Sequence, residues 1–421
     1  MNEHDHSHDA CDDSGFDRRN FMAGCGAAAA LAMSGIGVST AVAEETEEGD
    51  IEELLEGLPD NWNEWGDDDE RGALNLLGSE QAFAGMRAAT RRGAKHVEQF
   101  TLQVPMTGDT IESVLSGEGT SEDAGDPIYP PRTPARRNNT DDYRGYEGDP
   151  DEPVTFKSSD DAFVTKLFLH GTTHIDALGH VWYGDELYNG YPEKETGQPK
   201  QFDEPIRGLD EEGEAVDLDE TYGHSQASVA PLAASGIAGR GVLLDVGRQM
   251  GDDNGWLELG ASVTLEDLRA TADAQGVKLR DRDIILVRTG GTERAVDPDA
   301  KWGPLAEAGL TFSEELVEWV HEMEIPMIGA DNIAVEKLVQ VIDGKSYVIP
   351  LHCALLRDLG VTLNEIMWLK DIADQCAEDG IYEFLYTAAP LHVERATGAP
   401  VNPVVLKAVG DDRGKERGRG D

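Results

Sequence analysis

The spacing of apolar residues along the second half of the chain predicts strands and helices in alternation. Short apolar runs typical of buried strands occur at 241–246, 283–288, 325–330 and 347–351. Apolar residues at helical spacing occur at 79–92, 264–275, 312–323 and 369–376. This order is typical of an α/β layered domain with some parallel strand pairing.

Two of these helices carry signals at their ends. Thr264 and Asp267 approximate a capping box at the start of one predicted helix, and Gly276 is a typical stop at its end. Thr311 and Glu314 are placed to open the next helix in the same way. The helices at these two places are therefore expected to begin at the threonines.

Three segments lack this periodicity. Residues 44–60 are acidic and predict a linker. Residues 107–160 are rich in Gly, Asp, Pro and Asn, and a loop this long in a compact domain is disordered or functional, such as a lid. We expect substrate selection to lie in that loop. The charged tail at 409–421 predicts disorder.

Charge is the strongest signal in the composition. The chain holds 83 acidic and 35 basic residues, a formal net charge of −48. Repulsion of this size destabilises a compact chain in dilute buffer, whereas molar salt shortens the Debye length to about 3 Å and screens it. We interpret the acidity as halophilic adaptation. It argues against nucleic acid and anionic lipid as partners, because both repel such a surface.

The first 43 residues have the features of an export signal. Arg18 and Arg19 precede an uncharged run rich in Ala and Gly, which ends in the small-residue cleavage site Ala-Val-Ala at 41–43. This pattern resembles a twin-arginine signal, the type that carries folded proteins. We expect 1–43 to be removed and the protein to be extracellular or at the cell surface; the alternative is an uncleaved anchor. No other stretch is long or apolar enough to span a membrane.

Four potential metal ligands lie close together in the sequence. They are His170, His174, Asp176 and His180, in the spacing His-x3-His-x-Asp-x3-His. Imidazole and carboxylate are usual ligands of zinc and manganese. A chance cluster, or a set of histidines that only form hydrogen bonds in the core, explains this spacing less well. The segment therefore predicts a divalent metal site.

Convergence of the ligand atoms restricts the conformation of this segment. On a straight strand His170 and His174 would lie about 13 Å apart, at roughly 3.3 Å per residue. One helical turn would bring them together but would point Asp176 elsewhere. The segment must therefore leave a strand and coil, and Gly171 and Gly179 supply the backbone freedom for this.

Further candidates lie in the C-terminal half. His352 follows a predicted strand, and Glu365 comes after it in the sequence. Together they could complete a centre of one or two metals. His180 has two open roles, because it could act as general acid or base on a metal-bound water or could ligate a second metal.

The histidine segment resembles that of a known family. Cyclase or kynurenine-formamidase-like metal hydrolases carry His-x-Gly-Thr-His-x-Asp-x-Pro-x-His. The matching positions are His170, Thr173, His174, Asp176 and His180. Thr172 and Leu178 depart from this pattern, but the second half of the segment is similar to the His-x-Asp-Ala-Leu-x-His of the larger members. The resemblance covers most of residues 61–407.

The resemblance implies a fold and a metal centre. The implied fold is α/β, a swivelling β/β/α-type domain with a mixed sheet, in a single large catalytic domain at 61–408 that forms a homodimer or homotetramer. The implied ligands of one or two divalent metals, zinc or manganese, are His170, His174, Asp176, His352 and Glu365. It also implies that His180 is the catalytic acid/base and that Glu365 takes part in catalysis.

The resemblance further implies hydrolysis of an amide or lactam C–N bond. The metal would lower the pKa of a bound water to ~7 and hold the developing oxyanion, and His180 would carry the proton to the leaving nitrogen. The reference reaction is arylformamidase-like, from N-formylkynurenine to kynurenine and formate in tryptophan catabolism. Export favours an external amide, lactam or lactone. The alternatives are an exported metal- or solute-binding protein without turnover, and a metal-dependent cyclase or dehydratase.

Overall fold

The structure is a computed structural model of the 421-residue chain. It describes residues 46–106, 137–139, 161–163, 167–209, 215–297, 299–303 and 306–410. The export signal expected at 1–43, nearly all of the lid expected at 107–160 and the tail beyond 410 lie outside the described residues. What the sequence predicts for those segments stays a prediction.

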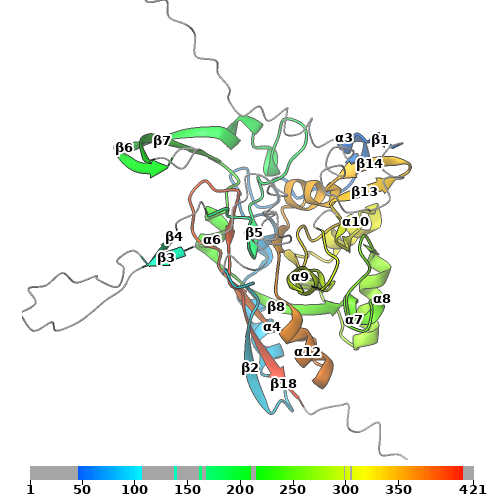
Figure 1. Ribbon diagram of the computed structural model, residues 1–421. Helices are drawn as coiled ribbons and strands as arrows, with labels where there is room; N and C mark the ends of the chain where they lie inside the picture. The colour runs from blue at the N-terminus through cyan, green and yellow to red at the C-terminus, as the bar shows by residue number, and fades with distance from the viewer. Residues whose placement is uncertain are drawn as a thin grey trace, which may run out of the picture.

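A nine-stranded mixed sheet forms the centre of the molecule (Figure 1). Its strands in spatial order are β17 (Gly398–Pro400), β5 (His174–Asp176), β15 (Thr362–Glu365), β12 (Met327–Ala330), β10 (Ile284–Arg288), β8 (Ile237–Asp245), β16 (Glu383–Ala388), β18 (Val404–Val409) and β2 (His96–Thr101). The strands from β15 to β8 run parallel, and the outer ones are antiparallel to their neighbours. The expected fold class, α/β with a mixed sheet in one main domain, is confirmed.

Apolar side chains cover both faces of the parallel strands. Every residue of β10 is buried, as is typical of a parallel strand between two layers. Alternate residues of β8 point to opposite faces. Val242 and Leu244 share a core with α8 (Leu265–Gln275) and α10 (Glu314–Glu322). Leu243 shares a second core with α12 (Lys370–Asp379).

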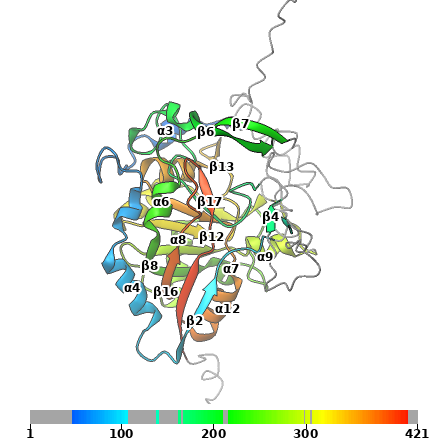
Figure 2. The ribbon, with the colours of Figure 1, turned by 90° about the vertical axis from the view of Figure 1, so that its left-hand side faces the viewer.

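The remaining helices lie around this sheet (Figure 2). They are α3 (Ile51–Leu55), α4 (Ser79–Ala89), α6 (Ala230–Ser235), α7 (Val246–Met250), α9 (Gly291–Val296) and α11 (Pro350–His352), with 3-10 turns at Gly72–Leu76, Tyr188–Gly190 and Glu193–Gly197. A π-helix, Cys353–Asp358, continues directly from α11. Within the described ranges, no helix has the length and apolar character needed to cross a membrane.

Smaller sheets surround the central one. They are β1 (Glu47–Glu48) with β14 (Lys345–Val348) and β13 (Val339–Ile342), β9 (Ser262–Val263) with β11 (Gly309–Leu310), β3 (Arg137–Asn139) with β4 (Asp161–Phe163), and β6 (Gln198–Leu209) with β7 (Ala215–Gly223). The β6–β7 pair is a two-stranded arm that projects from the body (Figures 1 and 2). The pair of β13 and β14 precedes α11 in the chain and so positions its start.

One predicted helix start is confirmed and the other is wrong. Thr264 and Asp267 form a capping box at α8. At α10 the cap is Ser313 rather than Thr311. The reason is that the Thr311 N–H donates to the carbonyl of Val263 and so prolongs the pairing of β11 with β9.

The strand predicted at 347–351 is wrong in its second half. β14 ends at Val348, and Ile349 adopts a left-handed conformation with φ 43° and ψ 52°. The chain then enters α11 at Pro350, a residue favoured in the first turn of a helix because that turn needs no N–H donor there. His352 therefore lies in a helix and not at the end of a strand.

Residues 46–60, expected as a linker, pack on the domain instead. β1 pairs in parallel with β14, and the carboxylate of Asp50 caps α3. Leu55 is buried in the main core, with Ile51 and Leu54 packed against it. These apolar residues have the spacing of one helix face, and the many acidic residues around them concealed it.

Candidate metal centre

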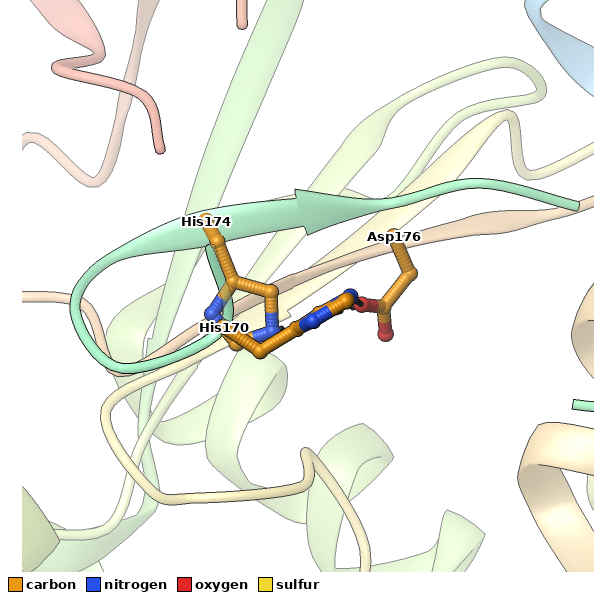
Figure 3. Close-up of side chains that lie close together, drawn as sticks. All are labelled: His170, His174 and Asp176. Atoms are coloured by element: carbon orange, nitrogen blue, oxygen red, sulfur yellow. Dashed lines mark ion pairs between the residues drawn. The ribbon is translucent and has the colours of Figure 1, made fainter. Parts of the chain in front are cut away.

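Strand β5 presents two of the expected ligands on one face. Alternate residues of a strand point the same way, so His174 and Asp176 extend to the same side of β5 (Figure 3). Both side chains are buried. Because β5 is paired with β15 on one edge and with β17 on the other, the sheet fixes the position of both residues.

His170 reaches the same point from a turn before the strand. The N–H of Gly171 donates to the Phe168 carbonyl at 2.9 Å, and the chain then folds back into β5 (Figure 3). The rings of His170 and His174 meet edge to face, with centroids 4.8 Å apart. Their Nε2 atoms lie 3.5 Å and 3.3 Å from the same oxygen of Asp176. These three residues form the first ligand group.

The coil predicted for this segment is present, but its glycines have a different role. Gly171 and Gly179 are both described, and neither has a positive φ. A Cβ atom on Gly179 would lie 2.8 Å from Nδ1 of His224. A Cβ atom on Gly398 of β17 would overlap the ring of His170. Gly179 and Gly398 therefore permit close packing around the segment.

A second ligand group combines Asp176 with His352 of α11 and Glu365 at the end of β15. Nε2 of His352 lies 3.1 Å from one oxygen of Glu365 and 3.9 Å from an oxygen of Asp176. The other oxygen of Glu365 lies 3.3 Å from Nε2 of His174. In each group the ligand atoms lie within 4.8 Å of one another. Because Asp176 belongs to both groups, the arrangement suits one cation or two that share Asp176.

Several of these atoms are buried without a hydrogen bond. They include Nε2 of His174 and both carboxylate oxygens of Asp176. Buried polar atoms are normally hydrogen-bonded, and a buried carboxylate needs a compensating positive charge. A divalent cation would coordinate these lone pairs, and imidazole with carboxylate is a donor set that zinc and manganese accept. The residues present therefore fit a metal.

Neighbouring groups orient the ligands through hydrogen bonds. Nδ1 of His174 lies 2.8 Å from the carbonyl of Thr172, which places the ring proton there and directs Nε2 toward the ligand group. Only the backbone of Thr172 takes part, so the departure from the family's glycine at this position leaves the contact unchanged. The Thr362 hydroxyl donates to the carbonyl of Asp176 at 2.6 Å, and the Asn364 amide donates to that of His174 at 2.7 Å.

The charges of the centre shift the pKa values of its members. Burial alone would lower the pKa of His174, but the negative charges of Asp176 and Glu365, each with an oxygen 3.3 Å from its Nε2, outweigh it and raise this pKa to about 9. Burial opposes a similar rise at His352, where bonds to Glu336 and Glu365 raise the pKa well above 6.5. Burial would raise the pKa of Glu365, but its bonds to the two histidines lower it. A cation must therefore displace protons from the imidazoles.

His180 lies beside the ligand groups and belongs to neither of those found among the described residues. Its ring stacks on that of His170, with centroids 4.4 Å apart and an interplanar angle of 17°. Burial lowers the pKa of His180 to about 3, so its imidazole is neutral at physiological pH. A neutral imidazole next to a metal can accept a proton. Its place outside both groups separates His180 from the ligands, and its low pKa leaves the ring uncharged.

The structure brings together all the residues that the sequence singled out for the site. They are His170, His174, Asp176, His180, His352 and Glu365. The sequence did not reveal Glu336, whose carboxylate lies 2.7 Å from Nδ1 of His352. No local motif marks Glu336, because it is one of 83 acidic residues and only folding brings it to His352.

The mixed α/β fold and the buried His/Asp/Glu centre define an α/β protein with a candidate metal centre. Comparison with known proteins shows its family. The family model described as "Putative cyclase" matches residues 102–337. A solved structure described as a novel cyclase is 30% identical, with a TM-score of 0.61, and the match covers 86% of this chain and 100% of that one. The chain belongs to the cyclase family.

More distant similarities are to isatin hydrolases. One is isatin hydrolase A from Labrenzia aggregata bound to benzyl benzoate, at 15% identity, 74% coverage of this chain, 94% of that one and a TM-score of 0.45. Another is an isatin hydrolase bound to the product analogue thioisatinate, at 17% identity, 79% and 100% coverage and a TM-score of 0.44. Similarity this low carries no argument about activity. No curated protein matches the chain.

Proposed function

We propose that this protein is a metal-dependent hydrolase that cleaves an amide or lactam C–N bond. The observation that carries the proposal is the buried convergence of two ligand groups on Asp176, with His180 beside them and outside both. A divalent cation bound there would supply Lewis-acid activation of a water and of a substrate carbonyl. Membership of the cyclase family supports the same reading.

Different residues of the chain would bind the metal and transfer the proton. The two ligand groups would hold the cation. His180 takes a proton while water attacks the carbonyl, and it then returns that proton to the leaving nitrogen. An amide nitrogen must be protonated to leave, so one imidazole acting first as base and then as acid completes the reaction.

The finer proposal concerns the substrate. An N-formyl anilide or a cyclic amide would suit the centre, with arylformamidase-like cleavage of N-formylkynurenine as the reference reaction and zinc or manganese as the cation. The support for this is the likeness of the segment from His174 to His180 to the family motif. Export by the twin-arginine pathway, a salty working environment, substrate selection by 107–160 and a homodimer or homotetramer are proposals that rest on sequence alone.

The test is an assay of the mature protein in molar salt against N-formyl anilides, lactams and lactones. We expect turnover that a chelator abolishes and that zinc or manganese restores. Turnover that survives complete removal of metal would contradict the proposal. Stoichiometric metal binding without turnover of any of these substrates would favour a binding protein instead.

A further inference from the structure

Glu336 is a buried carboxylate that touches the metal centre without belonging to either ligand group. Its side chain is 1% exposed. Oε1 accepts the backbone N–H of His352 at 2.7 Å and lies 2.7 Å from Nδ1 of the same residue. Oε2 accepts the N–H of Leu351 at 2.9 Å and the side-chain amide of Gln340 at 2.7 Å. Oε1 therefore contacts His352, and Oε2 bonds to Leu351 and Gln340.

The contact at Nδ1 makes His352 a different ligand from His174. A carboxylate at Nδ1 places the ring proton there and turns Nε2 toward Glu365, 3.1 Å away. A histidine with such a partner is held in orientation and is a stronger electron donor to a metal. His174 has only the neutral carbonyl of Thr172 in that place. The imidazole of His352 therefore has a carboxylate at Nδ1, whereas that of His174 has an uncharged partner there.

The backbone adopts an unfavourable conformation at Val335, the residue before Glu336. Val335 has φ 57°, and the N–H of Glu336 bonds to the carbonyl of Ala334. A bond between residues two apart around a positive φ defines the rarer, strained form of γ-turn. A positive φ is especially unfavourable for a β-branched residue such as valine. This turn sets the direction of the Glu336 side chain.

The same kind of strain recurs on both sides of His352. Ile349 has φ 43° and precedes Pro350, which makes the left-handed conformation harder to adopt. Ile366 has φ 53° and directly follows the ligand Glu365. The β-branched residues with positive φ in the described part of the chain are Val335, Ile349 and Ile366. Strain of this kind persists where the surrounding structure enforces it, and it concentrates at functional sites.

We propose that Glu336 is a positioning residue of the metal centre. Its carboxylate orients His352 and strengthens that residue as a ligand of the second group, and the strained turn at Val335 holds the carboxylate in place. This inference rests on the metal centre of the proposed function and is independent of the substrate.

A purely structural role would leave Glu336 as a cap of the helix that begins at Pro350. The N–H groups of Leu351 and His352 lie in the first turn of that helix, where carboxylates are favourable caps. Such a cap would stabilise the fold without acting on the metal. The two roles separate in an experiment that measures stability and metal affinity independently.

The experiment uses the full mature chain in molar salt and three variants. Glu336→Gln removes the charge behind His352. Gln340→Met removes a bond to Oε2 but leaves the contact of Glu336 with His352, and is the matched control. Glu336→Gln combined with Gln340→Glu restores a bond between the two side chains while an uncharged amide faces His352. Zn²⁺ and Mn²⁺ are titrated in competition with a chelating dye, and thermal unfolding is followed in chelator.

We expect Glu336→Gln to weaken metal binding by about 10- to 100-fold, the usual effect of losing such a partner. The double variant should recover thermal stability but not affinity, and Gln340→Met should bind metal as the parent does. Parental affinity in Glu336→Gln or in the double variant would overturn the inference and leave the metal centre intact. If Glu336→Gln fails to fold, the double variant carries the test. If the parent takes up neither metal, the metal centre and this inference are both refuted.

Discussion

Two clusters of buried charged side chains lie at neighbouring strand ends of the same sheet. One is the metal centre at β5 and β15. The other, which we call the arginine cluster, consists of Arg288 at the end of β10, Asp245 at the end of β8, Glu293 in α9 and Asp331 after β12. Both clusters are shielded from solvent and both are rich in carboxylates.

The arginine cluster supplies its own positive charge. Arg288 lies 2.7 Å from an oxygen of Asp245 and 2.7 Å from an oxygen of Glu293. Asp331 accepts the N–H groups of Thr289 and Gly290 as well as the hydroxyl of Thr289. Burial would lower the pKa of Arg288, but its carboxylate neighbours raise it. Asp245 and Glu293 therefore have a permanent cation beside them, and Asp331 is held by hydrogen-bond donors.

Among the residues that the structure describes, the metal centre has only imidazoles as its source of positive charge. In the described part of the chain, the ion pairs of Asp176 and Glu365 are all with histidines, which are cations only when protonated. Both oxygens of Asp176 also lack hydrogen bonds. The comparison indicates that buried carboxylates paired with arginine have a permanent cation beside them, whereas those paired only with imidazole can exchange the imidazole protons for a metal cation.

The largest effect should come from a residue that takes no part in the charge balance of the metal centre. We expect His180→Ala to keep its metal and to lose turnover by about 10²- to 10⁴-fold, because it removes the proton carrier. Metal titration and the amide assay measure the two properties. His321→Ala, at an exposed position on α10, is the control. Loss of metal in His180→Ala would show that His180 is a ligand, which would contradict its placement outside the two ligand groups.

Breaking the arginine cluster should affect stability alone. Arg288→Met leaves Glu293 buried without its cation and leaves Asp245 with Arg248 alone, which should lower the free energy of unfolding by about 3–5 kcal/mol. Urea denaturation in molar salt measures this loss. The matched control, Arg269→Met, breaks an exposed pair with Glu315 and should lower it by less than about 1 kcal/mol. Reduced metal affinity in folded Arg288→Met would show that the clusters are coupled.

Metal removal should take away the stability contributed by the metal centre and leave the arginine cluster unchanged. With free metal at 100 times its Kd, binding stabilises the folded protein by about 2.7 kcal/mol, and a chelator removes this increment. Thermal unfolding with and without chelator measures it. Folded Arg288→Met should show the same increment as the parent if the clusters are independent. An unfolding temperature that is unaffected by chelator in the parent would argue against a bound metal.

A smaller effect on stability should come from the titration of Glu307, whose pKa is influenced by both clusters. Burial raises the pKa of Glu307 to about 8, and the charges of Asp331 and Glu365 add to this rise. Because the folded pKa lies above the ordinary 4.5, the contribution of Glu307 to stability is complete below pH 4.5 and is lost as pH rises through about 8. Unfolding at pH 5, 7 and 9 measures the loss, on the order of a few kcal/mol at most. Glu307→Gln should flatten this profile, and an unchanged slope would assign the titration to another group.

The part of the site that sequence could predict depends on local spacing. His174 and Asp176 are two apart on a strand, so their shared face follows from strand geometry alone. The apolar runs that became β8 and β10 are buried on both faces, and this also appears in the local pattern. The α/β class and the histidine segment were therefore accessible from the sequence.

The remainder depends on contacts between distant segments. The helix that carries His352 begins where a strand was expected, because Pro350 and the carboxylate of Glu336 favour a helix start there. The fit of Gly398 against His170 becomes necessary only once β17 lies beside β5. Neither contact has a signature in the neighbouring sequence, so neither could have been foreseen from spacing.

The most direct test of the difference between the two clusters is the metal content of the mature protein, purified in molar salt without chelator. The account predicts one or two equivalents of zinc or manganese in the parent, and loss of that metal in His174→Ala while Arg288→Met retains it. A folded parent that contains no metal and takes up none on addition would contradict the account, because protonated imidazoles alone would then neutralise the carboxylates of the centre.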